Sequence, residues 1–328
     1  MYHRVLPEGE RDGVQAGMYV KPETFEAHLI YLKKHFKIIS LSELFTYLPS
    51  PPFRKGEKNQ KPWCILTFDD GWYDFYEYAF PILKKFEAPA TVFLSTDFIG
   101  TNKWFWTDRL INLLLHKQKA GSMEQGVKDK GLGKERKKQG EEDKEQLRSS
   151  KGVVNQIENL KGPYESRMEK AIQILKPYRD EEIEEILSEL SSRWSLIPDP
   201  QERPFLSWEE VREMAQSGLI TFGSHTASHR ILTTLGDDEI RDELMQSKDR
   251  LISEKVIDPS FIPFCYPNGN YNEKIVKMVK EAGYSLAVTT DNGWNTFGSD
   301  PFTLKRIGIH QDMASSEAMF GCRIIKLF

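Results

Sequence analysis

Short apolar runs alternate with helical patterns along most of this 328-residue chain. Residues 63–68 (WCILTF) and 90–94 (ATVFL) are continuous apolar runs of strand length, and residues 73–86 between them have helical spacing. Such alternation is typical of βαβ units, which build a largely parallel sheet. Further strands are predicted at residues 38–39, 220–222, 261–266 and 286–289, and helices at 237–255 and 272–282. With about seven strands in this order, the sequence predicts an α/β fold of the (β/α) barrel type.

The composition changes in the middle of the chain. Between residues 117 and 151, 18 of 35 residues are charged and few are large and apolar, so this stretch cannot bury a core of its own. Residues 164–194 have the pattern of two polar helices. We therefore expect one barrel domain from residues 1–116 and 200–328, a charged, flexible insertion at 117–152 that is helical or disordered, and a helical insertion at 153–199.

Overall charge and cysteine usage exclude several classes of protein. The chain has 45 Lys and Arg against 49 Asp and Glu, a net charge of −4, so it has no basic surplus for binding nucleic acid. Its three cysteines, Cys64, Cys265 and Cys322, are too far apart for a disulfide framework and fit a reducing compartment. No apolar stretch has the length of a transmembrane segment or a signal peptide. The sequence as it stands predicts a cytoplasmic protein, whereas a missing N-terminal segment would make it an exported or membrane-associated one.

Two adjacent carboxylates, Asp69 and Asp70, directly follow the predicted strand at 63–68. In α/β barrels the active site lies at the C-terminal ends of the strands, which is where these two residues would stand. The alternative is that Asp-Asp-Gly is an ordinary turn.

A second cluster, His225 and His229, follows the predicted strand at 220–222. Histidines at i and i+4 share one face if the segment is helical, and neutral imidazole is a common zinc ligand. The alternative is a pair of structural histidines. Two His and one Asp would form a three-ligand site open to water, which is the arrangement of catalytic metal centres, and the second Asp would be free to act as a base.

At these two motifs the sequence resembles the polysaccharide deacetylase family, carbohydrate esterases that share the NodB-homology domain. The family's first motif, T-F-D-D-G, stands at residues 67–71, and its second, H-[ST]-x-x-H, at residues 225–229. The resemblance implies a deformed (β/α) barrel of the NodB type and metal-dependent hydrolysis of an acyl group on a sugar. It also implies that Asp70, His225 and His229 bind one divalent metal ion, usually zinc, and that Asp69 is the general base.

The family's third motif, R-x-P-Y-G, is altered here to Cys265-Tyr-Pro-Asn268-Gly. A backbone N–H at Asn268 can still contact the oxyanion, because this contact does not depend on the side chain. The missing arginine normally orients the base, and Arg306 is a candidate substitute from another strand end, unless it is a structural or surface residue. Trp294, in a weak match to the fourth motif, is a candidate for the acyl pocket, although it could instead belong to the core.

Two histidines are candidates for the catalytic acid. Family members commonly use one near the C-terminus, and His310 fits that position. One branch of the family carries an N-terminal Tyr-His motif in the active site, and residues 2–5 (YHRV) resemble it, which makes His3 the preferred candidate. Trp72, beside the aspartates, is a candidate for the substrate groove.

The sequence thus predicts a metal-dependent hydrolase that removes an N-acetyl or other small acyl group from an amino sugar. The substrate would be a polysaccharide or a glycan precursor, and we expect neither a nucleic-acid partner nor a transmembrane segment. Two alternatives are a deformylase or other amide hydrolase that uses the same site, and a non-catalytic carbohydrate-binding homologue.

Overall fold

The computed structural model describes residues 1–10, 13–15, 17–47, 61–125, 149–199, 203–296 and 298–325. It divides the chain into two compact units. Unit 1 comprises Met1–Arg11, Ala16–Asn102 and Arg203–Phe328, and unit 2 comprises Asp12–Gln15 and Lys103–Glu202.

A parallel sheet of six strands forms the centre of unit 1, in the order β10-β9-β8-β7-β6-β5. Its strands are β5 (Leu66–Phe68), β6 (Ala90–Leu94), β7 (Ile220–Ser224), β8 (Pro263–Cys265), β9 (Leu286–Asn292) and β10 (Leu304–Arg306). Strands β6 and β7 are neighbours, with Ala90 opposite Ile220, although unit 2 lies between them in the sequence. The expected α/β barrel architecture is confirmed, with six strands in the main sheet.

Four short strands form two separate parallel pairs. Strand β1 (Arg4–Val5) pairs with β2 (Tyr19–Val20), and β3 (Lys37–Ile38) pairs with β4 (Trp63–Cys64). The apolar run at 63–68, expected as one strand, is divided between β4 and β5 by an interruption at Ile65.

The first two residues join the two ends of the six-stranded sheet. Tyr2 donates its N–H to the Thr67 carbonyl on β5, over 2.8 Å. The nitrogen of Met1 donates to the Ile307 carbonyl, and the N–H of Ile309 donates to the Met1 carbonyl, both over 3.0 Å. Because residues 307–309 follow β10, these bonds connect edge strand β5 to the segment beyond edge strand β10.

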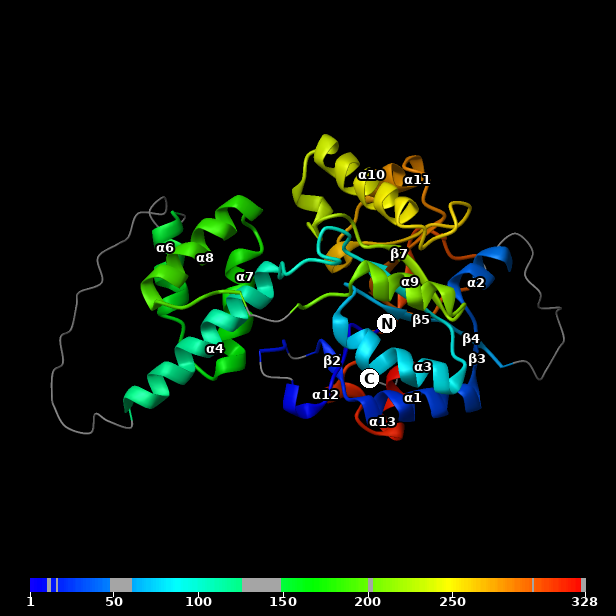
Figure 1. Ribbon diagram of the computed structural model, residues 1–328, viewed down its shortest axis with the longest axis horizontal. Coiled ribbons are helices and arrows are strands. Elements are labelled where there is room, and N and C mark those ends of the chain that lie inside the picture. Colours follow the sequence, from blue (N-terminus) through cyan, green and yellow to red (C-terminus); the bar gives the residue numbers. More distant parts are fainter. Residues whose placement is uncertain are drawn as a thin grey trace. The chain divides into compact units, whose positions relative to one another are not determined.

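Helices surround the sheet of unit 1. They are α1 (Pro22–His35), α2 (Leu41–Tyr47), α3 (Phe80–Phe86), α9 (Trp208–Gln216), α10 (Asp237–Ser253), α11 (Glu273–Glu281), α12 (Gln311–Ala314) and α13 (Glu317–Ile325). A π-helical segment, Phe75–Ala79, leads into α3, and short 3₁₀ turns occur at Glu8–Glu10, Leu232–Thr234 and Pro267–Gly269. In Figure 1, α10 and α11 lie together on one flank of the sheet, and α1 lies with α3 and α13 on the other.

Local sequence signals explain several of these helix ends. Ser207 and Glu210 form the reciprocal capping box that their spacing predicts at the start of α9. Asn272 caps α11 by accepting the N–H of Ile275 over 2.9 Å, and Gly283 follows that helix with a left-handed φ of 82°. These caps fix where the helices begin and end, and hence where the loops of the site emerge.

Unit 2 is helical, and it has its own core. Its helices are α4 (Trp106–Gln125), α6 (Ser150–Glu158), α7 (Tyr164–Leu175) and α8 (Asp180–Trp194). The two helices expected at 164–194 are confirmed as α7 and α8. Residues 103–116, which the sequence analysis assigns to the barrel, belong to unit 2, because Leu110 and Leu113 of α4 are fully buried in its core. Within the expected insertion at 117–152, residues 126–148 lie outside the described residues.

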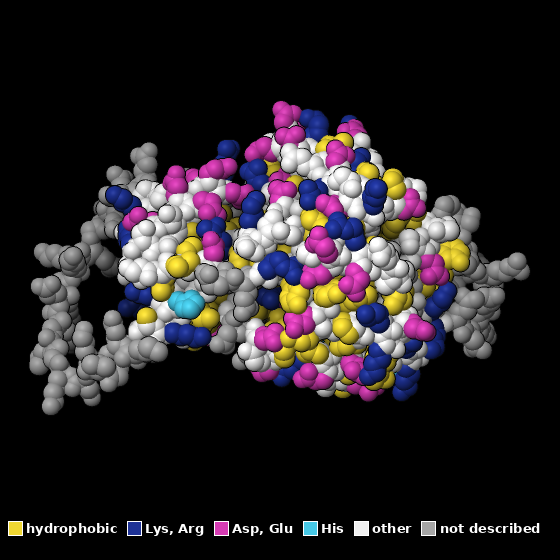
Figure 2. All heavy atoms as spheres, viewed as in Figure 1, with side chains coloured by type: hydrophobic (Ala, Val, Ile, Leu, Met, Phe, Trp, Pro, Cys, Tyr) yellow, Lys and Arg dark blue, Asp and Glu magenta, His cyan; other side chains and the backbone are white. Residues whose placement is uncertain are grey.

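On the face shown in Figure 2, acidic and basic side chains are interspersed. Within the described residues, no helix combines the length and the apolar character that crossing a membrane requires.

Candidate metal centre

Two adjacent carboxylates follow β5 in a tight turn. Asp70 and Gly71 both have left-handed backbone conformations, with φ of 76° and 83°. A Cβ on Gly71 would lie 2.7 Å from a side-chain atom of Leu94, so this position needs glycine for space as well as for its φ. The turn buries Asp69 and Asp70 next to each other but directs their carboxylates to different partners.

Two histidines reach Asp70 from the loop that follows β7. The Nε2 atoms of His225 and His229 each lie 3.4 Å from Asp70 Oδ1. The two histidines share no helix face, because this segment is a loop in which Thr226 and His229 have left-handed φ values of 65° and 62°. Local hydrogen bonds hold the loop: Thr226 donates its N–H to Ser224 Oγ, and His229 donates its N–H to Thr226 Oγ1. The two imidazoles therefore come together through a loop and not through the i, i+4 spacing of a helix.

The ring of His225 has a defined tautomer. Its Nδ1 lies 2.8 Å from the backbone oxygen of Cys265. Because a carbonyl oxygen can only accept, we infer that Nδ1 carries a proton, so that Nε2, on the side of Asp70, is the ring nitrogen that would bind a metal ion. A ligand histidine commonly has this arrangement, with its second ring nitrogen bonded to a backbone carbonyl.

Asp70, His225 and His229 form a donor set suited to a divalent metal ion. Their ligand atoms all lie within 4.8 Å of one another, and Asp70 and His225 are buried. Burial raises the pKa of Asp70, but hydrogen bonds from the two histidines outweigh it and hold that pKa well below its ordinary value. Two imidazole nitrogens and one carboxylate oxygen suit zinc and neighbouring transition metals, so the residues present fit the expected group.

A second group of possible ligands, Asp69, His225 and Cys265, lies beside the first. It is a poorer cation site, because both carboxylate oxygens of Asp69 are already bonded to Arg306. The guanidinium also lies 3.1 Å from Cys265 Sγ and would repel a cation there. Burial raises the pKa of Cys265, which keeps it a thiol rather than the thiolate that binds metals.

Arg306 holds Asp69 in a bidentate ion pair. Its two terminal nitrogens each lie 2.7 Å from one carboxylate oxygen, and its Nε donates to the Thr289 carbonyl over 2.7 Å. One terminal nitrogen also donates to Thr67 Oγ1 over 3.2 Å. Burial raises the pKa of Asp69, but the charge and hydrogen bonds of Arg306 lower it to about 2. Asp69 is therefore a fixed, ionised carboxylate at neutral pH.

Of the two candidate acids, the structure brings His3 to the aspartates. Its Nε2 lies 3.9 Å from Asp69 Oδ2. Burial lowers the pKa of His3, and the charges of Asp70 and Asp69 oppose that effect. His310 instead hydrogen-bonds Asp312 through its Nδ1, next to the turn at residue 17.

Trp72 differs from the expectation of a groove-lining residue. It is only 2% exposed, stacks on Phe205 with ring centroids 4.5 Å apart, and lies under the Arg4 guanidinium at 4.4 Å. Its indole N–H donates to Asp70 Oδ2 over 2.9 Å. Trp72 therefore supports a candidate metal ligand from within the core, since the packing of Phe205 and Arg4 on its ring leaves it little surface for a sugar.

Asn268 stands in the turn after β8, at the same end of the sheet as the aspartate and histidine loops. It is exposed and left-handed, with φ of 53°, and is followed by Gly269 at 73°. A Cβ on Gly269 would lie 1.8 Å from Thr290 Oγ1, so the turn packs directly against β9. This packing fixes the backbone of the residue expected to contact the oxyanion.

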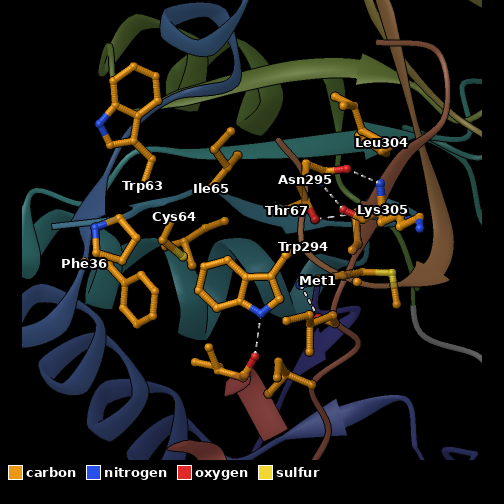
Figure 3. A pocket seen from close by; sticks show the side chains of 18 of the residues that line it. Met1, Phe36, Trp63, Cys64, Ile65, Thr67, Trp294, Asn295, Leu304 and Lys305 are labelled. Carbon is orange, nitrogen blue, oxygen red and sulfur yellow. Dashed lines mark hydrogen bonds between the residues drawn. The ribbon is translucent and has the colours of Figure 1, made fainter. Parts of the chain in front are cut away.

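Trp294 lines an apolar pocket of about 560 Å³, together with Phe36, Trp63 and Leu304. It is 46% exposed, and its indole N–H donates to the Ile324 carbonyl over 2.9 Å (Figure 3). Thr67 and Arg306 also line this pocket, which places it against the Arg306 side of the ion pair. Trp294 is thus not a fully buried core residue, and its indole N–H bonds α13 at Ile324 rather than Asp70 or the histidines.

Sequence reasoning missed several residues that support the site. Asp74 accepts the N–H of Val5 over 3.0 Å and forms an ion pair with Arg4, whose Nε lies 2.6 Å from it. These two contacts anchor the strand that follows His3. Glu243 binds the loop between the two histidines. The sequence signal that could have pointed to them is that Arg4 directly follows His3, because the other partners are distant in the chain.

Comparison with known proteins gives a family-level match. The model of the family described as Polysaccharide deacetylase matches residues 56–287. A relative from Bacillus subtilis (strain 168), YxkH, is 31% identical over 119 residues, which is 36% of this chain and 41% of that protein. The poly-beta-1,6-N-acetyl-D-glucosamine N-deacetylase of Staphylococcus epidermidis is 34% identical over 111 residues, 34% of this chain and 35% of that protein. The chain thus aligns with less than half the length of these two curated relatives.

Solved structures show a similar fold. The Streptococcus pyogenes deacetylase PplD in complex with acetate matches 96% of this chain and 92% of its own, with a TM-score of 0.57 and 20% identity. IcaB from Ammonifex degensii matches 98% of this chain and 94% of its own, with a TM-score of 0.57 and 18% identity. At these identities the likeness concerns the fold alone.

Proposed function

Since this chain belongs to the polysaccharide deacetylase family, we propose that it is a metal-dependent hydrolase acting on acetylated amino sugars. It would remove an N-acetyl or other small acyl group by cleaving the amide C–N bond. The observation that carries this proposal is the donor set of Asp70, His225 and His229 next to the Asp69–Arg306 ion pair.

The proposed metal is one divalent ion, with zinc the first to test. Asp70 Oδ1 and the Nε2 atoms of His225 and His229 would hold it. When bound, such an ion supplies a positive charge that acidifies water and polarises an acyl carbonyl. Three protein ligands leave room for water and substrate, as catalytic sites require.

Asp69 would act as general base. Hydrolysis forms a C–O bond from water and breaks the C–N bond, so one proton must leave the attacking water and another must reach the departing nitrogen. Because its pKa is lowered to about 2, Asp69 is ionised and can accept the first proton, which it then holds only weakly. Arg306 keeps the carboxylate in place during this transfer.

His3, in its protonated imidazolium form, would supply the proton to the departing nitrogen. Its Nε2 lies 3.9 Å from Asp69 Oδ2, so both groups border the same space. Asn268, at the neighbouring strand end, would offer its backbone N–H to the oxyanion of the tetrahedral intermediate.

The relative from Staphylococcus epidermidis suggests which substrate to test first. That protein is named a poly-beta-1,6-N-acetyl-D-glucosamine N-deacetylase. We therefore propose β-1,6-linked N-acetylglucosamine oligomers as the first substrate for this chain, with other acetylated amino-sugar glycans and precursors as the comparison set.

The test combines metal content with acetate release for the wild type, Asp69→Asn and a control, Asp312→Asn. Asp69→Asn should keep its metal and lose acetate release, because it removes the base but no ligand. Asp312→Asn changes an exposed aspartate that is bonded to His310, so it should match the wild type.

Other outcomes would favour the two alternatives. A wild-type protein that binds no metal and releases nothing after zinc or cobalt is added would favour a carbohydrate-binding homologue. Release of formate from an N-formyl sugar, with no acetate from the acetylated one, would favour a deformylase.

A further inference from the structure

Helix α10 delivers a buried carboxylate to the loop that carries the two histidines. Glu243 is 8% exposed, and its Oε2 accepts the backbone N–H groups of Ala227 and Ser228 over 3.0 and 2.9 Å. Its Oε1 accepts the hydroxyl of Ser228. One side chain therefore satisfies three donors from the two residues just before His229.

This loop needs an external acceptor to keep its shape. Thr226 and His229 both have left-handed φ values, which are unfavourable for residues other than glycine. The amides of Ala227 and Ser228, which lie between them, both point toward Glu243. Without the carboxylate, the buried Ala227 amide would lose its acceptor, and the cost of an unsatisfied buried amide would favour another loop conformation.

The two histidines are anchored differently. His225 is fixed by its backbone N–H, which donates to the Leu94 carbonyl, and by the bond between its ring and the Cys265 carbonyl. The backbone N–H of His229 donates to Thr226 Oγ1 within the loop. The loop before it is held by Glu243 at two amides, and by the N–H groups of Thr96 and Asp97, which donate to the Thr226 and Ala227 carbonyls. A change at Glu243 should therefore displace His229 more than His225.

We propose that Glu243 is a positioning residue that sets the loop so that His229 meets Asp70 and His225 before a metal ion arrives. This inference rests on the proposed metal-dependent function, because it assigns Glu243 a role in metal capture. Glu243 acts through the backbone of Ala227 and Ser228, and it is not itself a proposed ligand.

The test compares Glu243→Ala, Glu243→Gln and a control, Leu251→Ala. Glutamine can still accept both amides through its carbonyl oxygen and can donate to Ser228 Oγ, whereas alanine can do neither. Leu251 is buried on the same helix, two turns beyond Glu243, so its truncation destabilises the protein without touching the loop.

Two readouts are needed. The first is the Co²⁺ affinity of the metal-free protein, measured by competition with a chromogenic chelator, together with the absorption spectrum of the Co²⁺ complex. The second is amide hydrogen exchange at residues 226–229 in the metal-free protein. We expect Glu243→Ala to bind Co²⁺ about 10- to 100-fold more weakly, as for other residues that orient ligands, and to exchange faster at these amides. Glu243→Gln and Leu251→Ala should both stay close to the wild type.

Three results would overturn the inference. The first is wild-type Co²⁺ affinity and exchange in Glu243→Ala. The second is a Leu251→Ala variant whose Co²⁺ affinity falls as much as that of Glu243→Ala, which would attribute the loss to lower overall stability. The third is a Glu243→Gln variant that binds Co²⁺ as weakly as Glu243→Ala does, which would rule out hydrogen bonding as the cause. A wild type that binds no Co²⁺ would instead refute the proposed metal centre, and the exchange data would still decide whether Glu243 holds the loop.

Discussion

Arg306 on β10 binds both carboxylate oxygens of Asp69, although the two residues are 237 positions apart in the sequence. Cys265, on β8, two strands away from β10 in the sheet, lies against the same pair, with its Sγ 3.6 Å from Asp69 Oδ2. The residue that orients the proposed base thus comes from a different strand than the altered third motif implies. Where the motif usually has an arginine, this chain has Cys265, and its small thiol leaves room for the Arg306 side chain.

Arg306→Ala should reduce both activity and stability. It leaves a buried carboxylate without its partner, which typically costs about 3–5 kcal/mol, and it frees Asp69 to rotate. We expect kcat for acetate release to fall by about 10²- to 10³-fold, as for other lost electrostatic contacts. Urea unfolding and initial-rate assays measure the two effects.

Adding Cys265→Arg to Arg306→Ala should restore part of both losses, because a guanidinium from β8 would enter the space beside Asp69 that the alanine leaves. The matched control is Cys265→Ser with Arg306→Ala, which adds no charge. Equal recovery in the two double variants would contradict this account of the ion pair.

Trp72→Phe should weaken metal binding while preserving the core. Phenylalanine keeps an aromatic ring on Phe205 but loses the indole N–H that donates to Asp70 Oδ2. Loss of such a bond to a ligand typically lowers metal affinity about 10- to 100-fold. Chelator competition measures the change, and Trp208→Phe, at another buried tryptophan, is the control that should keep the wild-type affinity.

His3→Gln and His310→Gln should separate the two candidate acids. His3 lies 3.9 Å from Asp69, whereas His310 is bonded to Asp312. General acid catalysis typically contributes about 10²- to 10⁴-fold, so His3→Gln should lower kcat by a factor in this range. His310→Gln should leave kcat close to that of the wild type. The reverse order of effects would transfer the role to His310.

His28 should make stability depend on pH. Its Nε2 donates to the Ala314 carbonyl over 2.7 Å, so its Nδ1 must accept the hydroxyl of Tyr2 at 3.2 Å, and the ring stacks on Phe320. Burial lowers the pKa of His28 from 6.5 to about 4, and the bond to Ala314 opposes this shift. The folded protein therefore favours the neutral ring. The neutral His28 ring therefore contributes to the free energy of unfolding. Its contribution is fully present above pH 6.5 and is lost as the pH falls toward 4.

At 1.36 kcal/mol per pKa unit, the loss amounts to about 3 kcal/mol across that interval. His28→Phe keeps the ring stack but cannot titrate, so its unfolding free energy in urea should fall less steeply between these pH values. His35→Gln, at an exposed histidine on the same helix, should keep the wild-type slope. An unchanged slope in His28→Phe would show that other groups cause the acid sensitivity.

The residues that could be predicted from the sequence are those whose signal is local. Asp70, His225 and His229 stand in short motifs directly after strands, and the parallel sheet brings the ends of those strands together. The structure brings these three side chains together even though the His225–His229 segment is a loop, because a loop and a helix can both place two rings near one carboxylate.

The rest of the site depends on contacts between distant segments. Nothing local indicates that Glu243 reaches the histidine loop or that Trp72 turns inward to Asp70. The unit boundary was missed for a similar reason. The apolar face of α4 has the pattern of a barrel helix, and only its packing against α7 and α8 assigns it to unit 2.

The bonds of Met1 and Tyr2 also bear on the order in which the protein assembles. The bond from Met1 to Ile307 spans 306 positions, whereas the core of unit 2 is built from residues between 110 and 190. Closing a longer loop costs more entropy, and distant contacts slow folding. During synthesis on the ribosome, unit 2 can fold before β7 has emerged, but the first residues must wait for the segment after β10. We therefore expect His3 and Arg306 to reach Asp69 only at the last stage of folding, so that a nascent chain has no competent proton-transfer site until its barrel has closed.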